Sequence, residues 1–317
     1  TVGAIGFAVA GFGVSIGPSY VIVMIGLIVF GSMFSICDVA MNLQGAVNER
    51  VLGRSIMPVF HAFFSFGTVI GAALGAAAEA IRLPIVVHLL IVALVFAAGA
   101  LIASRFLQSE HVIEEQSVAH DDHSKTWQGR LSIWRDPRTL IIGLIVLGMA
   151  FTEGSANDWL ALAMVDGHDT TKATGALVLG IFVASMTIGR LAGVSLLDRY
   201  GRVPVLRGSA VLAAIGLIMV IFVPVLWISI VGVVFWGLGA SLGFPVGMSA
   251  AADDPKTAAA RVSAVATIGY FAFLVGPPLI GFLGQHVGLL HALLVVLVLV
   301  ALAGLASGAA REPSARR

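Results

Sequence analysis

The sequence has few charged residues, a single cysteine and almost no net charge. Charged side chains make up 11% of the 317 residues, against about 25% in soluble proteins, which leaves too few to cover a water-exposed surface. The lone Cys37 excludes a disulfide framework. A net charge of +1 provides no general attraction for nucleic acid, so we expect no nucleic-acid partner.

Apolar residues dominate instead, at 59% of the chain, with a mean hydropathy of +1.02. A helix needs about 20 apolar residues to cross a bilayer, and the long runs do not alternate as the strands of a membrane barrel do. The sequence therefore predicts an all-α polytopic membrane protein with ten visible spans. These are 2–16, 20–47, 56–80, 84–106, 139–163, 173–197, 205–223, 226–250, 262–284 and 289–309.

The positive charges lie mainly on one side of this topology. Of the 18 lysines and arginines, fifteen fall in the loops and tail of one side, whereas the other side has only Arg82 and Lys172, and Arg190 lies within a span. Because cytoplasmic loops carry the excess of positive charge, we expect a multi-pass protein of the cell inner membrane. The linker and the C-terminus are expected to be cytoplasmic.

The one long polar stretch, 107–138, separates four spans from six. A shift of 208 residues places Gly31 on Gly239, and the first four spans then match the last four in order. The fifth and sixth spans have no partner in this register, so we expect two further helices before Thr1 and an arrangement of six plus six. The predicted parts are an N-terminal bundle of four of six helices, a cytoplasmic linker, a C-terminal six-helix bundle and a cytoplasmic tail. Their bounds are 1–106, 107–138, 139–310 and 311–317.

The run 198–202, Asp-Arg-Tyr-Gly-Arg, follows the sixth span and is preceded by Gly189-Arg190 and Gly193. This run resembles the cytoplasmic loop signature of the major facilitator superfamily. The resemblance implies the major facilitator fold, here lacking its first two helices, and alternating access by rocking of the two halves. It assigns a gating loop motif to Arg190, Gly193, Asp198, Arg199, Gly201 and Arg202.

One acid lies within the second visible span. Ser35, Asp38 and Asn42 have i, i+3, i+7 spacing and share a helical face. An acid followed four residues later by asparagine in this helix resembles the fucose-permease-like sugar–proton symporters. That resemblance implies that Asp38 couples transport to protons and that Asn42 binds substrate. A structural Asp38, paired with Arg190 or with another helix, is the alternative.

The fifth span contains the most polar stretch inside any span. Glu153 and Asn157 are i, i+4 neighbours, followed by Asp158 and Trp159. Because charges inside a membrane are costly and mark functional sites, we expect Glu153 to couple to protons and the other three to bind substrate. Trp159 could instead be an interfacial tryptophan, and Asp158 could lie near the outer surface.

Polar residues of other spans complete the predicted site. His61 is expected either to bind substrate or to be a hydrogen-bonded histidine that only packs in the interior. Thr267 and Tyr270 are expected to line the other side of the cavity. Arg190, a basic residue inside a span, is expected to pair with an acid such as Asp198 or to face an anionic substrate.

The sequence lacks the motifs of several other functional classes in the setting that they require. The G-x-S-x-G match at 239–243 lies in an apolar helix instead of a strand–turn–helix setting, and there is no Walker loop. The His-Asp-Asp-His run at 120–123 is expected to be solvated linker. We therefore expect no enzyme, no cofactor and no metal.

The sequence favours a secondary transporter, with proton-coupled symport of a small polar, sugar-like solute as the leading hypothesis. A drug or metabolite efflux antiporter is the first alternative, and a non-transporting membrane receptor or scaffold is the second. The expected partners are the solute, protons and the lipid bilayer, and we expect a monomer.

Overall fold

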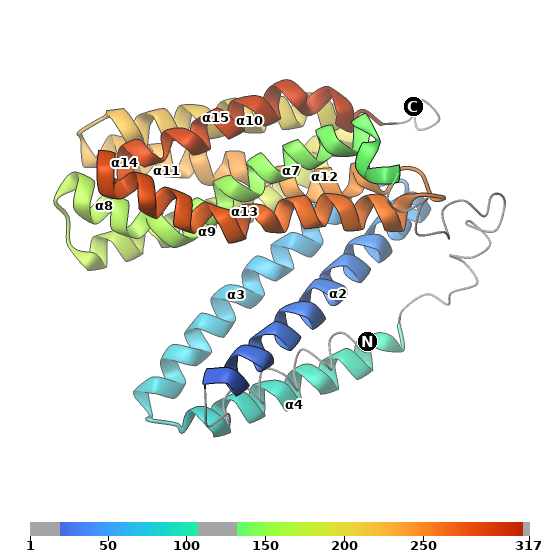
Figure 1. Cartoon of the computed structure of the whole chain (residues 1–317), viewed down its shortest axis with the longest axis horizontal. Helices are drawn as coiled ribbons and strands as arrows, with labels where there is room; N and C mark the ends of the chain where they lie inside the picture. The colour runs from blue at the N-terminus through green and yellow to red at the C-terminus, as the bar shows by residue number, and fades with distance from the viewer. Residues whose placement is uncertain (1–19, 107–131, 313–317) are drawn as a thin grey trace. The chain divides into compact units, whose positions relative to one another are not determined.

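The structure is a computed structural model that describes residues 20–106 and 132–312. The described residues are almost entirely helical (Figure 1). The elements before residue 107 are α2 (Tyr20–Leu52), α3 (Met57–Ala80) and α4 (Ile85–Ser104). Those after residue 131 are η2 (Ile133–Arg135), α7 (Pro137–Ser155), η3 (Ala156–Leu160), α8 (Ala161–His168), α9 (Lys172–Tyr200), α10 (Arg202–Phe222), α11 (Leu226–Ala240), α12 (Gly243–Ala251), α13 (Ala258–Val287), α14 (Leu289–Ala292), α15 (Leu294–Ala306) and η4 (Ser307–Ala310).

Nine helical stretches within the described residues are long and apolar enough to cross a membrane. They correspond to nine of the ten predicted spans; the remaining prediction, 2–16, lies outside the described residues. The fifth span runs from Pro137 to His168 and not from 139 to 163. The longer span results because α7, η3 and α8 follow one another without a break.

The chain forms two compact units. Among the described residues, the first comprises 20–44 and 66–106, and the second comprises 45–65 and 132–312. In the first unit α4 has no buried residue, and its large exposed side chains are leucine, isoleucine, valine and phenylalanine. Apolar exposure of this extent along a helix is suited to lipid and would be a liability in water.

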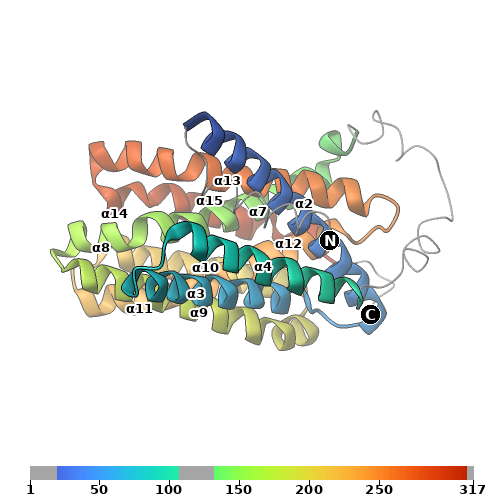
Figure 2. The same ribbon diagram turned by 90° about the horizontal axis from the view of Figure 1, so that it is seen from below.

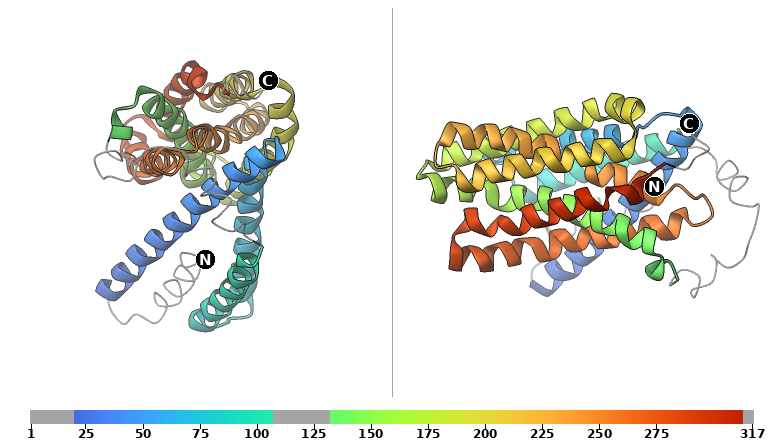
Figure 3. Two further views of the ribbon diagram at one scale, coloured as in Figure 1. Left: turned by 90° about the vertical axis from the view of Figure 1, so that its right-hand side faces the viewer. Right: turned by 90° about the horizontal axis from the view of Figure 1, so that it is seen from above.

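The second unit is a helical bundle. α10 packs against α11 and α15, and α7 packs against α13 and α15. The left view of Figure 3 shows these helices nearly end-on. α8 and α14 meet at one end of the bundle (Figures 1 and 2), which we call the α8 end. α7 begins, and α9 and α12 stop, at the opposite end, which we call the α12 end.

Glycines allow the closest helix contacts of this bundle. Gly216 of α10 and Gly232 of α11 face each other so closely that a Cβ added at Gly232 would lie 2.8 Å from the Gly216 carbonyl oxygen. Gly239 meets the backbone of Ala213 and Ser209 in the same way. Small residues permit such approach in membranes, where packing drives helix association. Next to this seam, the fully buried Trp236 stacks edge-on against Phe182.

Three spans of the second unit are irregular in the middle. η3 is a π-helical turn between α7 and α8, α11 and α12 are separated at Ser241 and Leu242, and α13 contains Pro277 and Pro278. A π turn and a helix break both leave main-chain groups that need other partners, and such features are frequent at functional sites.

Candidate functional site

A buried arginine connects three helices at one of these irregularities. Arg190 of α9 is 2% exposed, and its Nη2 donates to Oε2 of Glu153 on α7 at 2.8 Å. Its Nη1 donates to the Ser65 hydroxyl and to the His61 carbonyl oxygen, and its Nε donates to the Ser241 carbonyl oxygen at 3.4 Å. We call these five residues the Arg190 cluster.

The Arg190 cluster compensates the buried charge of the Arg190 guanidinium. A guanidinium inside a membrane is costly unless it is paired and hydrogen-bonded. The break between α11 and α12 supplies a free carbonyl at Ser241, and the carboxylate of Glu153 supplies the opposite charge. The Glu153 side chain is 12% exposed, against 2% for Arg190. The acid is therefore the more exposed member of the pair.

The acid partner of Arg190 is Glu153, and not Asp198, which the sequence analysis offered as an example. Asp198 lies eight residues further along the same helix, about 12 Å along its axis. At the α12 end Asp198 accepts from Nε of Arg54 at 3.4 Å and from the main-chain N–H of Ser55 at 3.0 Å. The expected pairing of Arg190 with an acid thus occurs through a neighbouring helix.

His61 enters the cluster through its main chain. Its carbonyl oxygen accepts from Arg190 and from the Ser65 hydroxyl, while its ring packs edge-on against Phe244, with 5.3 Å between the ring centroids. The side chain is 7% exposed. This geometry gives His61 a structural part in holding Arg190.

The other polar residues of the fifth span lie in the π-helical turn, which begins three residues after Glu153. Asn157 and Asp158 are exposed, and Trp159 is half-buried. The Trp159 indole N–H donates to the Pro277 carbonyl oxygen at 3.2 Å, and the ring lies against Gly281 of α13. The tryptophan therefore joins the π turn to the proline-containing part of α13.

Asp38 and Asn42 lie in the part of α2 that belongs to the first unit. The Asn42 amide donates to the Asp38 carbonyl oxygen at 2.9 Å, one turn earlier in the helix. Asn42 is buried and Asp38 is half-buried. The Asn42 amide is therefore held by the main chain of Asp38.

Thr267 lines a cavity of about 500 Å³ on α13, together with Ser263, Lys256 and Trp134. The Thr267 hydroxyl donates to the Ser263 carbonyl oxygen at 2.8 Å and is exposed, whereas Tyr270 is half-buried. Thr267 therefore borders this cavity, and the assignment of Thr267 and Tyr270 to the substrate pathway stays a prediction.

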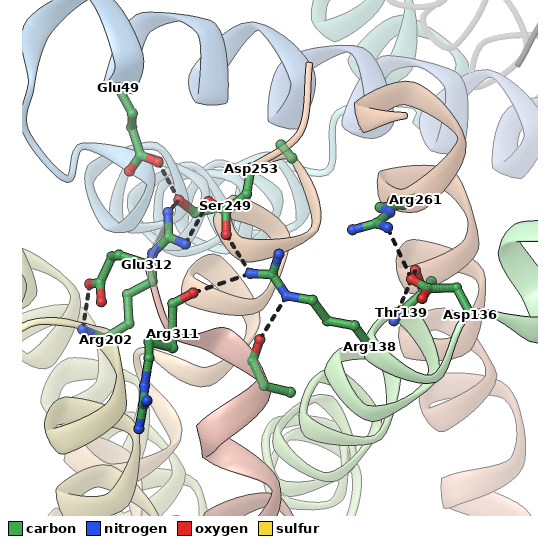
Figure 4. Close-up of polar contacts among 12 residues, drawn as sticks. Glu49, Asp136, Arg138, Thr139, Arg202, Ser249, Asp253, Arg261, Arg311 and Glu312 are labelled. Carbon is green, nitrogen blue, oxygen red and sulfur yellow. Dashed lines mark hydrogen bonds and ion pairs between the residues drawn. The ribbon is translucent and has the colours of Figure 1, made fainter. Parts of the chain in front are cut away.

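A second polar cluster occupies the α12 end (Figure 4). Glu49 of α2 accepts from the Ser249 hydroxyl and from the Met57 main-chain N–H at 2.9 Å. Ser249 in turn accepts from Nη2 of Arg202 at 2.8 Å. The carboxylate of Asp253 bridges two arginines, accepting from Arg202 at 2.8 Å and from Arg138 at 2.7 Å. We call Glu49, Ser249, Arg202, Asp253 and Arg138 the arginine network.

The network balances two acids against two arginines, and all of these charged groups except that of Arg138 are buried. Glu49 is 4% exposed and Arg202 5%, and the side chain of Asp253 is 4% exposed. Buried charges of this kind persist when each is paired and hydrogen-bonded. The Ser249 hydroxyl is the link between Glu49 and the helices after residue 137.

The loop motif residues have distinct roles beside this network. Gly193 lies against Leu242, where a Cβ would collide with the leucine side chain. Gly201 has a φ of +77°, a conformation that favours glycine. It is the N-cap residue just before α10 and provides no side-chain cap. The Glu312 carboxylate takes that place and accepts from the Arg202 main-chain N–H at 2.7 Å. Arg199 lies over the Tyr200 ring.

The sequence analysis missed most of the arginine network. It used Arg138 only for topology and did not consider the acids Glu49, Asp253 and Glu312. Glu49 and Glu312 each adjoin an arginine at the end of a span, and Asp253 lies three residues before Lys256; acids beside basic residues at span ends were the available signal. Within the described residues, no group of three His, Cys, Asp or Glu side chains is placed to hold a metal ion.

Comparison with known proteins agrees with this architecture. The family model of the Major Facilitator Superfamily matches residues 154–316. An uncharacterised transporter of this type from Yersinia pestis is 31% identical over 262 residues, covering 82% of this chain and 65% of the relative. An uncharacterised transporter from Sinorhizobium fredii is 31% identical over 305 residues, covering 93% of this chain and 78% of the relative.

Solved structures show the same fold. The transporter FucP in its outward conformation matches with a TM-score of 0.80 and 16% identity, covering 98% of this chain and 81% of FucP. The human organic anion transporter MFSD10 matches with a TM-score of 0.72 and 15% identity, covering 96% of this chain and 75% of that one. The predicted fold class is confirmed, and the chain is a multi-pass membrane protein that belongs to the major facilitator superfamily of transporters.

Proposed function

We propose that this transporter is a proton-coupled symporter of a small polar, sugar-like solute. The observation that carries the proposal is the ion pair between the partly accessible Glu153 and the buried Arg190. When Glu153 takes a proton, Arg190 loses its counter-ion in an apolar environment, which disfavours the present arrangement. Protonation and conformation are then coupled through one pair of residues.

Other residues would complete the site. Asp38 is a second acid within a span, and it is proposed to share in proton coupling, with Asn42 binding substrate. Asn157 and Asp158 are exposed beside Glu153, and their amide and carboxylate suit a solute rich in hydroxyl groups. Thr267 and Tyr270 are proposed to border the same pathway. The structural neighbour FucP is a fucose–proton symporter, and this likeness supports the same class of solute.

The arginine network is proposed to close the cytoplasmic side. Positive charge is concentrated in the loops on the side where the α12 end lies, which favours that end as cytoplasmic in an inner membrane. Opening would separate Glu49 from Ser249. The bundles at 1–106 and 139–310, the linker at 107–138 and the tail at 311–317 remain the proposed organisation, with a monomer as the working unit.

The test measures proton flux. The protein is expressed in cells, and external pH is recorded while neutral hexoses, L-fucose among them, are added one at a time. Symport predicts external alkalinisation on addition of the transported sugar, and Glu153→Gln should abolish it. Asp166→Asn, which changes an exposed acid of α8, is the matched control and should leave the flux intact.

Three outcomes would overturn the proposal. External acidification on adding the solute would indicate antiport, the first alternative. Accumulation of solute along a pH gradient by an Asp38→Asn, Glu153→Gln double variant would exclude both acids as the proton carriers. Labelling that reaches only one end of the pathway under all conditions would favour a receptor.

A further inference from the structure

A groove runs along the second unit between α9 and α10, with the end of α11 as its floor. Its volume is about 390 Å³, and its lining is almost entirely apolar. Small residues open it: Ala192 and Gly208 are both exposed, and a Cβ at Gly208 would meet no atom within 4 Å. The lining includes Gly189, Ala192, Leu196, Tyr200, Gly208 and Leu212.

The groove has the length and depth of a lipid chain in one leaflet. On α9 it extends from Gly189 to Tyr200, a distance of about 16 Å at 1.5 Å per residue. This is about half of the hydrocarbon thickness of a bilayer, which is about 30 Å. One end of the groove adjoins the helix break at Ser241, and the other lies where α9 stops.

The positively charged side chain of Arg199 lies at the end of the groove where α9 stops, which is the α12 end of the bundle. Arg199 is exposed, and its guanidinium carbon lies 5.2 Å from the centroid of the Tyr200 ring, which lines the groove. No carboxylate of the described residues pairs with Arg199, whereas Arg202 nearby is paired with Asp253. An arginine in this position is suited to bidentate contact with a phosphate.

We propose that the groove binds one acyl chain of an anionic glycerophospholipid, with the lipid phosphate at Arg199. The apolar lining accepts the chain, and Arg199 and the Tyr200 hydroxyl provide contacts at the level of the headgroup. Anionic lipid is favoured over zwitterionic lipid because each arginine near the membrane surface adds about 1 kcal/mol of attraction to anionic headgroups. The site is independent of the solute and of the proton chemistry proposed above.

The test is native mass spectrometry of the purified, delipidated protein with phosphatidylglycerol added back. We expect one tightly bound lipid per chain. Gly208→Leu fills the open space in the groove and should remove this lipid, and Ala192→Leu should do the same from the opposite wall. Gly180→Leu is the matched control, because Gly180 is an exposed glycine of α9 with equally open space but does not line the groove.

The headgroup contact is tested separately. Arg199→Gln should lower the affinity for phosphatidylglycerol about fivefold, the factor that corresponds to about 1 kcal/mol. Arg207→Gln is the control, since the Nε of Arg207 donates to Ser307 of η4. Equal binding of phosphatidylethanolamine, or equal lipid occupancy in the Gly208→Leu and Gly180→Leu variants, would overturn the proposal.

Discussion

The Arg190 guanidinium donates to the Glu153 carboxylate at 2.8 Å, joining α9 to α7 inside the bundle. Removing only the acid or only the base leaves an uncompensated charge in an apolar setting. We expect Arg190→Gln to destabilise the protein by about 3–5 kcal/mol. The Arg190→Gln, Glu153→Gln double variant should recover much of this loss, as measured by the melting temperature in detergent. Equal melting temperatures for the single and double variants would contradict the pairing.

The Ser249 hydroxyl links Glu49 to Arg202, so Ser249→Ala should loosen the α12 end. The change leaves a buried acceptor and a buried donor without their partner, which costs about 1–3 kcal/mol for each. The readout is the rate of maleimide labelling at Ala46→Cys, a buried position, in a Cys37→Ala background. We expect faster labelling in Ser249→Ala. Ser229→Ala, at a buried serine bonded to Val223, should leave the rate unchanged.

Gly239→Ala should destabilise the seam between α10 and α11. The added methyl group would meet the main chain of Ala213 and Ser209, and overpacking of this kind costs about 1–3 kcal/mol. Gly180→Ala is the control, since its added methyl group meets open space and alanine favours a helix over glycine by up to about 1 kcal/mol. A melting temperature that rises in both variants would refute the close contact.

Asp136 supplies a pH-dependent contribution outside the spans. Burial alone would raise the pKa of its carboxyl, but the hydrogen bonds from Thr139 and the charge of Arg261 outweigh it and lower the pKa below its usual range. A lowered pKa stabilises the folded state above the unfolded value, about 3.9, and this contribution is lost as pH falls through the folded value. Asp136 also caps α7 through the Thr139 main-chain N–H at 3.1 Å.

Two variants separate the charge from the cap. Asp136→Asn keeps a good capping residue but should lose the acid-dependent part of the stability and the ion pair with Arg261. Asp136→Ala should lose the cap as well, at a further cost of about 1 kcal/mol. Melting temperatures between pH 7 and pH 3 provide the check. An acid dependence in Asp136→Asn equal to that of the natural protein would assign it to another group.

The sequence predicted the spans and the family because both depend on local patterns. Apolar runs locate helices regardless of their partners, and the run from Asp198 to Arg202 resembles its family signature by adjacency alone. The partner of Arg190 could not be predicted in this way. Helical spacing indicates which face a residue occupies, but it does not indicate which helix lies opposite that face.

The π-helical turn and the arginine network could not be predicted from sequence patterns either. An i, i+4 relation between Glu153 and Asn157 assumes an uninterrupted α-helix, whereas a π turn begins at Ala156. Glu49 and Ser249 are 200 residues apart, and neither belongs to a recognisable motif. Contacts of this kind depend on how helices assemble, which hydropathy and spacing do not specify.

Two of the bonds that hold Arg190 come from main-chain carbonyl oxygens, those of His61 and Ser241. A main-chain carbonyl oxygen is present whatever side chain the residue carries. A substitution at either position therefore leaves the acceptor in place as long as the main chain keeps its path. An alanine scan would therefore register Glu153 and Ser65 and overlook half of the arginine's partners. A related chain with another small side chain at position 241, which packs against Gly189, would still hold a cation at the same depth in the membrane.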